Sequence, residues 1–318
     1  MKCLSIGEMI VDFLPGESED MFLRRAGGAP ANLAVAVARQ ECEAGFCGMA
    51  GDDDFGRFLL RTLVDNGVTP LVTELTGEAV TTMAFVTLDA QGERSFVFAR
   101  KPGADMLLEK RHIGHPFFDE ADMVHAGSCS LSKGPAAETT VYAMEEGHRR
   151  GKMISFDINY REWMWDFDRT AAAAAVGILL PLVDFLKFSE EEADMVGCAA
   201  ETDFFDFLRE KHIAVAVETR GAAGARCFWN GRIIEVSGVP AACVDTTGAG
   251  DAFWGGFLAA LMKAGLKNPA ELNEELLLEA LRRGNVCGAL CVQKKGAVES
   301  LPTANETERY MREMYPPV

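Results

Sequence analysis

The sequence predicts an α/β protein with a doubly wound, mainly parallel sheet, helices on both faces of that sheet, and a small β-sheet lid beside it. Short apolar runs alternate with helix-compatible segments along most of the chain, which is typical of consecutive βαβ units. Two regions, residues 10–26 and about 71–100, break this alternation with β-type runs. In such a sheet the connections are right-handed, and ligands gather at the C-terminal ends of the strands.

The expected strands of the main sheet are short and apolar, as strands buried on both faces should be. They cover residues 3–6, 123–125, 153–156, 185–188 and 213–217. Helix-compatible segments separate most of them, and we expect helices over residues 29–39, 55–65, 136–149, 202–210 and 252–263. The alanine-rich stretch 171–175 also predicts helix.

The small sheet is predicted from two β-type runs, residues 81–88 and 94–99. Between them, Asp89-Ala90-Gln91-Gly92 is a turn signal, so the two runs predict a hairpin. We interpret residues 10–26 and 71–100 as one lid, built from separate segments, on a single domain that spans residues 1–318. No linker or repeat divides the chain.

Composition and net charge argue against two classes of binding partner and predict a cellular location. The 318 residues are 48% apolar and 25% charged, an ordinary mix for a globular protein, and the net charge is −17. Such acidity argues against nucleic acid and against anionic membranes. Nine scattered cysteines without a C-x-x-C pair, and a first segment that resembles a strand rather than a signal peptide, predict a cytoplasmic location. The longest apolar stretches, such as 171–183, are too short to span a membrane.

The most informative segment is Asp-Thr-Thr-Gly-Ala-Gly-Asp-Ala-Phe at residues 245–253. Gly248, Ala249 and Gly250 leave room for backbone N–H groups to converge on an anion at the start of an apolar helix. Asp251 would repel that anion unless it had a chemical role, and accepting a proton from a hydroxyl that attacks a phosphoryl group is such a role. The alternative for Asp251 is a simple helix cap.

These residues resemble the C-terminal motif D-T-x-G-A-G-D of the ribokinase-like (PfkB) sugar kinases. A second motif of that family is matched by Gly-Gly-Ala-Pro-Ala-Asn-Leu-Ala at residues 27–34. The resemblance covers nearly the whole chain and is closest to the fructokinase branch. Smaller matches lie between the two motifs, at residues 51–56, 92–96, 102–105 and 156–161.

The resemblance implies a ribokinase-like fold and assigns the catalytic residues. Asp251 would be the general base, and Gly248, Ala249 and Gly250 would hold the transferring phosphoryl group. The alternative for the glycine segment is a tight turn before a helix, and both descriptions can hold at once.

The resemblance places the sugar near the other motif. Asp12 would accept hydrogen bonds from sugar hydroxyls, and Asn32 would bond another hydroxyl. Gly27 and Gly28 would let the backbone approach the sugar. Without the resemblance, Asp12 would be read as a solvated turn residue, and residues 27–32 as a glycine-rich helix entry with Asn32 on a polar face.

Four further residues are assigned to the sugar end. Arg100 and Arg161 are the candidates for positive charge there, although a lone arginine is usually solvated or paired with a carboxylate. Asp105 and Asn159 are secondary candidates at the same end.

The nucleotide residues are expected at the end of the strand 213–217 and beyond. Thr219, Gly221 and Gly224 resemble the family turn T-x-G-x-x-G, which lies against ATP phosphate and ribose. Asn285 matches a family position near the adenine, and Lys187 is also assigned to the nucleotide. A Gly-x-x-Gly turn is common in hairpins, and Asn285 could be a polar residue on a helix face.

The metal assignment rests on Glu192. The family carries N-x-x-E at this place, and here Ser189 stands where Asn is usual. By resemblance Glu192 would organise Mg²⁺ through water, while ATP phosphates and waters hold the ion itself. The three acids at 190–192 could also be only the first turn of a helix. Many relatives also use a monovalent cation, so K⁺ is a further candidate.

The resulting prediction is an ATP-dependent kinase that phosphorylates a primary sugar hydroxyl, with fructose to fructose 6-phosphate favoured. Rivals in the same class are 2-keto-3-deoxygluconate kinase and aminoimidazole riboside kinase. A catalytically silent sugar-binding protein on the same fold and a Rossmann dehydrogenase are the rivals from other classes. The expected partners are sugar and ATP, with neither nucleic acid nor membrane, and family members often form homodimers.

Overall fold

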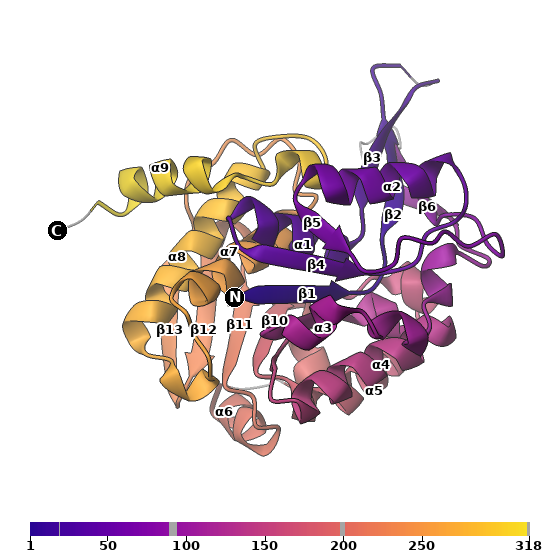
Figure 1. The fold of residues 1–318 in the computed structure, drawn as a ribbon. Helices are drawn as coiled ribbons and strands as arrows, with labels where there is room; N and C mark the ends of the chain where they lie inside the picture. The colour runs from indigo at the N-terminus through magenta and orange to yellow at the C-terminus, as the bar shows by residue number, and fades with distance from the viewer. Residues whose placement is uncertain (19, 89–93, 198–200, 317–318) are drawn as a thin grey trace.

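The computed structural model describes residues 1–18, 20–88, 94–197 and 201–316, and within these ranges the chain forms a nine-stranded sheet and a separate four-stranded sheet (Figure 1). Helices cover both faces of the larger sheet. The predicted fold class, a doubly wound α/β fold with a smaller β-sheet, is therefore confirmed. The predicted turn at residues 89–92 lies outside the described residues.

The nine-stranded sheet has the order β13-β12-β11-β10-β9-β8-β1-β4-β5. Its strands are parallel except for β12 and β13, which are antiparallel to their neighbours. From β1 the chain adds β4 and then β5 on one side of the sheet, and it then crosses to add β8 on the other side of β1. Ligands bind at such switch points in the strand order. The strands are β1 (Lys2–Ile6), β4 (Glu43–Cys47), β5 (Val68–Pro70), β8 (Met123–Gly127), β9 (Met153–Asp157), β10 (Phe185–Ser189), β11 (Val215–Thr219), β12 (Gly224–Trp229) and β13 (Arg232–Ser237).

Two hydrophobic cores lie on opposite faces of this sheet. One core contains α1 (Ala29–Arg39), α2 (Asp54–Asp65), α7 (Ala249–Lys263) and α8 (Glu274–Cys291). The other contains α3 (Pro116–Glu120), α4 (Gly134–Arg149), α5 (Arg169–Leu179) and α6 (Glu201–Glu210). The last helix, α9 (Ala304–Met314), packs on α8. Figure 1 shows α4 and α5 on one side of the strands and α7 and α8 on the other.

The contact between α1 and α7 brings the two predicted motifs together. Helix α1 is built largely of alanine and valine, and a Cβ added at Gly255 of α7 would lie 2.4 Å from the Ala36 Cβ. Small side chains therefore let the two helices touch almost backbone to backbone. Their N-terminal ends, which carry residues 27–34 and 245–251, consequently meet at one edge of the sheet.

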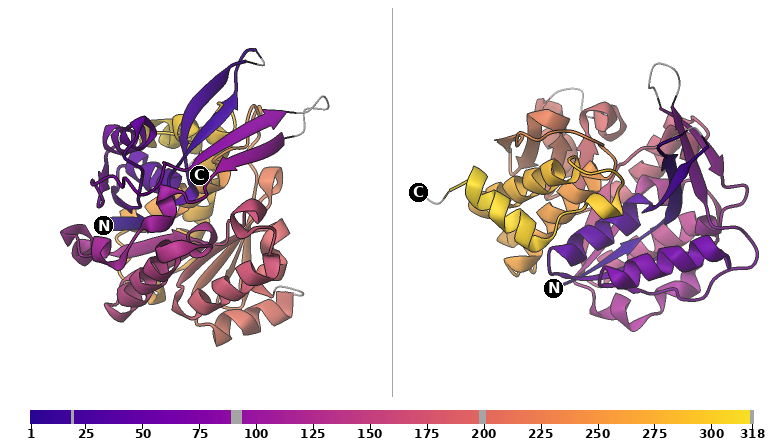
Figure 2. Two further views of the ribbon diagram at one scale, coloured as in Figure 1. Left: turned by 90° about the vertical axis from the view of Figure 1, so that its right-hand side faces the viewer. Right: turned by 90° about the horizontal axis from the view of Figure 1, so that it is seen from above.

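The four-stranded sheet has the order β3-β2-β6-β7 and stands apart from the larger sheet (Figure 2). Its strands are β2 (Ile10–Pro15), β3 (Phe22–Gly27), β6 (Met83–Leu88) and β7 (Arg94–Ala99). Residues 71–82 of the expected lid region form none of these strands. Phe13 of β2 stacks on Phe85 of β6, with ring centroids 4.7 Å apart, and meets Phe55 of α2 edge-on at 5.5 Å.

Two features of the larger sheet differ from the sequence expectation. The strand expected at 213–217 spans Val215–Thr219, and the β12–β13 hairpin was not anticipated. Asn230 and Gly231 connect β12 to β13 and both have positive φ, 48° and 73°. An Asn-Gly pair between apolar runs is a strong hairpin signal that the expectation overlooked.

In the described part of the chain, no helix combines the length and the apolar character needed to cross a membrane.

Candidate active site

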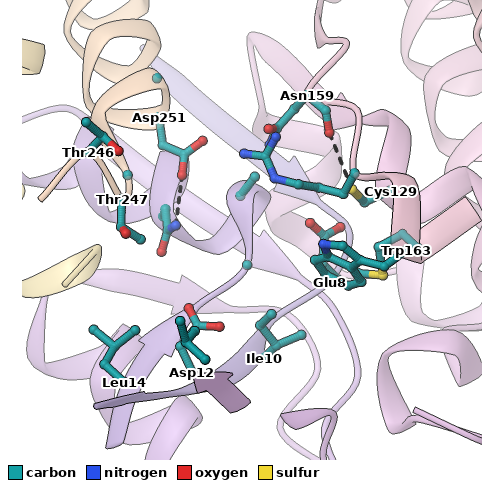
Figure 3. A pocket seen from close by; sticks show the side chains of 18 of the residues that line it. Glu8, Ile10, Asp12, Leu14, Cys129, Asn159, Trp163, Thr246, Thr247 and Asp251 are labelled. Carbon is teal, nitrogen blue, oxygen red and sulfur yellow. Dashed lines mark hydrogen bonds between the residues drawn. The ribbon is translucent and has the colours of Figure 1, made fainter. Parts of the chain in front are cut away.

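A cavity of about 430 Å³ lies where the C-terminal ends of the larger sheet's strands face the small sheet. Ile10, Asp12 and Leu14 line it from β2, where alternate residues share one face. The other walls come from the starts of α1 and α7 and from the segments after β8 and β9 (Figure 3). The predicted site residues that line the cavity are Asp12, Gly28, Asn32, Asn159, Arg161, Lys187, Gly248, Gly250 and Asp251.

Asp251 is held in this cavity by Asn32. The Asn32 Nδ2 donates to Asp251 Oδ2 at 2.8 Å, a bond between the two motifs across 219 residues of chain. Burial raises the pKa of Asp251, while Asn32, Lys187 and Arg161 act in the opposite direction. In Figure 3 the second carboxylate oxygen points into the cavity. Asp251 is thus an anchored carboxylate with one oxygen available.

The N-terminus of α7 faces the same space. Gly248 precedes the helix with φ 79°, in the left-handed region, and no side chain in the described ranges caps the helix. Asp245 fixes the preceding loop, because its two carboxylate oxygens accept from the backbone N–H groups of Thr247 and Gly296, each at 3.0 Å. A rigid loop with uncapped helix donors is suited to binding an anion.

A buried ion pair adds positive charge beside this loop. Lys187 Nζ lies 2.7 Å from Asp157 Oδ2, and both side chains are about 6% exposed. A Cβ added at Gly250 would lie 3.3 Å from Lys187 Nζ, so the ammonium group is next to the glycine loop. Burial raises the pKa of Asp157 to about 6, against the lowering effect of Lys187. The Asp157 Oδ1 is buried without a hydrogen-bond partner among the described residues.

Asp12 sits against the glycine pair of the first motif. A Cβ added at Gly27 would lie 2.1 Å from Asp12 Oδ2, so only glycine leaves room for this carboxylate. The pKa of Asp12 is raised to about 7, chiefly by burial and then by Glu299, and Arg161 lowers it. Arg161 follows β9 and lines the same cavity.

Arg100 and Asp105 do not line the cavity; they form a buried pair. The guanidinium donates to Asp105 Oδ2 from Nε at 3.0 Å and from Nη2 at 2.8 Å, and it also contacts Ser132 Oγ at 3.3 Å. Thr82 Oγ1 donates to the other oxygen of Asp105. Arg100 and Asp105 therefore bond to each other, to Ser132 and to Thr82, and their assignment to the sugar remains a prediction.

Apart from Lys187, the predicted nucleotide residues lie outside the cavity, farther along the same edge of the sheet. Thr219 ends β11, which pairs with the Lys187 strand β10, while Gly221 and Gly224 form the turn into β12. Asn285 on α8 donates through Nδ2 to the backbone carbonyls of Val236 and Ser237, at 3.2 and 3.1 Å. Lys187 thus connects the cavity with the strand ends assigned to the nucleotide.

Glu192 is engaged by backbone donors. Its oxygens accept from Tyr160 N at 2.6 Å and Ser189 N at 2.8 Å, the second as part of a capping box at the start of the 3₁₀ helix Glu190–Val196. Within the described ranges, no three His, Cys, Asp or Glu side chains are grouped to hold a metal ion. The assignment of Glu192 to a metal ion remains a prediction.

Several lining residues were missed by sequence reasoning. Glu8 lies four positions before Asp12, and Trp163 two positions after Arg161, so both stand beside residues that the motifs identified. Trp163 stacks on Phe98 of β7 and so links the small sheet to the segment after β9. Single Glu and Trp residues carry no spacing signal. Cys129 and Met164 were also missed, whereas Thr246 and Thr247 belong to the motif at residues 245–253 but received no role of their own.

Comparisons with known proteins agree with this geometry. The model of the pfkB family carbohydrate kinases matches residues 1–304. The fructokinase of Vibrio alginolyticus is 37% identical over 308 residues, covering 96% of this chain and 97% of that protein. The crystal structure of a fructokinase from Xylella fastidiosa with bound ATP superposes with a TM-score of 0.89 and 32% identity, covering 98% of both chains. Aminoimidazole riboside kinase of Salmonella enterica superposes with a TM-score of 0.83 and 30% identity, covering 98% of this chain and 100% of that one.

Proposed function

The chain belongs to the pfkB family of carbohydrate kinases, and we propose that it transfers the γ-phosphoryl group of ATP to the primary hydroxyl at C6 of fructose. The observation that carries this proposal is Asp251, an anchored carboxylate with one oxygen facing the cavity beside the uncapped N-terminus of α7. A base next to an anion site is the arrangement that phosphoryl transfer to a hydroxyl requires.

At the phosphoryl end, Asp251 accepts the proton of the C6 hydroxyl as its oxygen attacks phosphorus and ADP leaves. The raised pKa of Asp251 makes it a stronger base than an exposed aspartate, and Asn32 orients it. The backbone N–H groups around Gly248 and Gly250, with the Lys187 ammonium, stabilise the charge that develops on the phosphoryl oxygens.

At the sugar end, Asp12 and Asn159 bind hydroxyl groups, and the backbone at Gly27 and Gly28 borders the ring. The Asn32 Oδ1 accepts a hydrogen bond from another hydroxyl group. This oxygen is buried without a hydrogen-bond partner among the described residues. Arg161, which lines the cavity, donates to a hydroxyl group of the sugar. The sugar roles of Arg100 and Asp105 would be indirect, since their buried pair supports the segment next to the cavity.

For the nucleotide, we assign Lys187 to the phosphates, Thr219, Gly221 and Gly224 to the phosphates and ribose, and Asn285 to the adenine side.

Mg²⁺ neutralises the phosphates when bound. Glu192 and Asp157 offer carboxylate oxygens to its waters, consistent with the absence of a three-ligand cluster in the described ranges. K⁺ is the candidate monovalent cation.

The small sheet is proposed to act as a lid and as a homodimer surface. Its residues Ile10, Leu14 and Val86 line the cavity, and the Phe98–Trp163 stack is a contact through which closure would be transmitted. Exclusion of water would protect ATP from hydrolysis. Three apolar side chains on or beside its edge strands are exposed: Met21 (48%), Phe22 (44%) and Val97 (61%).

A coupled ADP-release assay tests the proposal with fructose, 2-keto-3-deoxygluconate, ribose and aminoimidazole riboside as acceptors. We expect the highest kcat/KM with fructose. A higher value with one of the other acceptors would reassign the substrate within the family. Binding of fructose without any ADP release, measured with ATP and Mg²⁺ present, would identify a catalytically silent sugar-binding protein instead.

A further inference from the structure

Glu8 places a buried carboxylate oxygen in the cavity wall without a partner. The residue is 3% exposed and lines the cavity, and its Oε2 has no hydrogen-bond partner among the described residues. A buried acceptor without a donor is unfavourable, so a ligand that supplies a donor is stabilised there. Figure 3 shows Glu8 on the side that also holds Cys129 and Trp163, opposite Thr246, Thr247 and Asp251.

The backbone at Glu8 belongs to the fixed part of the molecule. Glu8 follows β1 at the switch point of the larger sheet, where Gly7 N donates to Cys47 O of β4 at 3.1 Å. A Cβ added at Gly28 would lie 2.5 Å from the Glu8 carbonyl oxygen, so the start of α1 packs directly on this residue. The backbone that carries the Glu8 carboxylate is therefore held by the larger sheet and by the start of α1.

The charges in the cavity favour a hydroxyl as the group that Glu8 binds. Three carboxylates, Glu8, Asp12 and Asp251, line the same cavity. Two basic side chains line it in the described ranges, Arg161 and Lys187, and Lys187 is paired with Asp157, so the acidic groups outnumber the cations. An acidic sugar would place its carboxylate beside three acidic side chains, whereas a neutral sugar hydroxyl can donate to Glu8.

We propose that Glu8 Oε2 accepts a hydrogen bond from the C1 hydroxyl of fructose and that Glu8 thereby makes the site selective for a ketose. The inference rests on the proposed function. With the C6 hydroxyl beside Asp251, the C1 hydroxymethyl group is the substituent on the far side of the furanose ring, and Glu8 lies on that side of the cavity. Ribose has no hydroxymethyl group on its anomeric carbon, so it would leave the Glu8 oxygen unpaired.

The experiment compares fructose with 1-deoxyfructose in the wild-type enzyme and in Glu8→Ala and Glu8→Gln. The wild-type enzyme should prefer fructose by about tenfold to a hundredfold in kcat/KM, because the analogue leaves a buried acceptor unpaired. In Glu8→Ala this preference should fall to about threefold or less, mainly through a higher KM for fructose. Glu8→Gln keeps a carbonyl oxygen, so it should show an intermediate preference.

Glu218→Gln is the matched control. Glu218 is also a buried glutamate, 6% exposed, but it accepts from Arg226 Nε at 2.7 Å and does not line the cavity. This variant should keep the wild-type preference for fructose over 1-deoxyfructose.

Two results would overturn the assignment of Glu8. One is equal use of the two sugars by the wild-type enzyme, which decides the question even if a variant fails to fold. The other is an undiminished preference in folded Glu8→Ala. Both leave the kinase activity in place, whereas absence of ADP release with fructose in the wild-type enzyme would contradict the proposed function itself.

Discussion

The two sheets enclose one cavity, but their strands are buried to very different degrees. Every residue of β8 and β9 in the larger sheet is buried, whereas β3 in the small sheet alternates between exposed and half-buried residues over its first four positions. The larger sheet is covered on both faces by helices, and the small sheet packs on α2 through contacts such as Phe13–Phe55. Groups at the end of the larger sheet are therefore more rigidly held than groups on the small sheet.

This difference in burial predicts different effects for residues supported by the larger sheet and residues on the small sheet. Asp251, Lys187 and Asp157 lie at the proposed phosphoryl end and are supported by the larger sheet and α7, so their replacement should lower kcat or stability. Asp12 lies on β2 of the small sheet, so its replacement should act mainly on KM. Rigid support suits charge stabilisation in the transition state, which needs donors that do not reorganise. A less buried sheet suits entry and release of the sugar.

The largest effect is expected for Asp251→Asn. The amide cannot accept the proton, so kcat should fall by about a thousandfold while fructose affinity changes little. Steady-state kinetics with calorimetric fructose binding would measure both. Asp54→Asn is the control, because Asp54 also stands in the first turn of a helix but lies at the surface. Turnover of Asp251→Asn within a few fold of wild type would remove Asp251 as the base.

Asp157→Asn should have the next largest effect, on stability. It leaves the Lys187 ammonium buried without its charged partner, which should lower the free energy of unfolding by about 3 kcal/mol. Urea unfolding without nucleotide would measure this loss. Combining it with Lys187→Met should restore part of the lost stability, since the unpaired charge is then gone. A double variant less stable than Asp157→Asn would contradict this reading of the pair.

Asp12→Asn tests the small-sheet side of the comparison. A carboxyl group that offers two oxygens to sugar hydroxyls becomes an amide with one acceptor oxygen, so KM for fructose should rise by about tenfold to thirtyfold with kcat nearly unchanged. Initial-rate kinetics would separate the two parameters. If kcat fell as strongly as in Asp251→Asn, Asp12 would belong functionally with the phosphoryl end.

Glu8→Gln should change the pH dependence of stability without ligands. Burial raises the pKa of Glu8 to about 7, with Asp105 and Asp251 adding to the rise and Arg100 opposing it. The folded protein therefore retains a proton that the unfolded chain loses above about pH 4.5, so stability falls as pH rises from about 4.5 to 7. In Glu8→Gln, the free energy of unfolding should fall by about 1–2 kcal/mol less between pH 5 and pH 7.5 than in the wild-type protein. Urea unfolding at the two pH values would measure this difference. An identical fall in both proteins would argue against a buried titrating carboxyl.

The smallest effect on catalysis is expected for Val97→Lys. Val97 is 61% exposed on the edge strand β7, so a charge there should change kcat/KM less than twofold. If this sheet forms the homodimer contact, the variant should sediment as a monomer at concentrations where the wild-type protein is a dimer. A wild-type monomer, or a Val97→Lys dimer of unchanged affinity, would exclude Val97 from such a contact.

Patterns of neighbouring residues were enough to predict much of the fold. The helix expected at residues 29–39 coincides with α1, and the strands expected near residues 123, 153 and 185 coincide with β8, β9 and β10. Continuous apolar runs indicate strands buried on both faces. The β12–β13 hairpin was missed because the Asn230–Gly231 turn was not given weight.

The part of the site that the motifs and the family resemblance cover was predicted from the sequence. The two motifs contain Asn32 and Asp251, and the family resemblance added Asp12 and Lys187; all four line one cavity. The motifs did not reveal that Arg100 is occupied by Asp105, because pairing in space leaves no pattern of spacing along the chain. Nor did they distinguish Glu8 from the other acidic residues of this acidic protein.

Local sequence therefore identified the α/β class, the two motifs and the candidate base, because helix starts, glycine turns and apolar periodicity depend on nearby residues. The Asn32–Asp251 bond, the Lys187–Asp157 pair and the unpartnered oxygen of Glu8 depended on the folded chain. Each arises where segments far apart in the sequence are packed together, and burial there determines which polar groups are paired and which are left for a ligand.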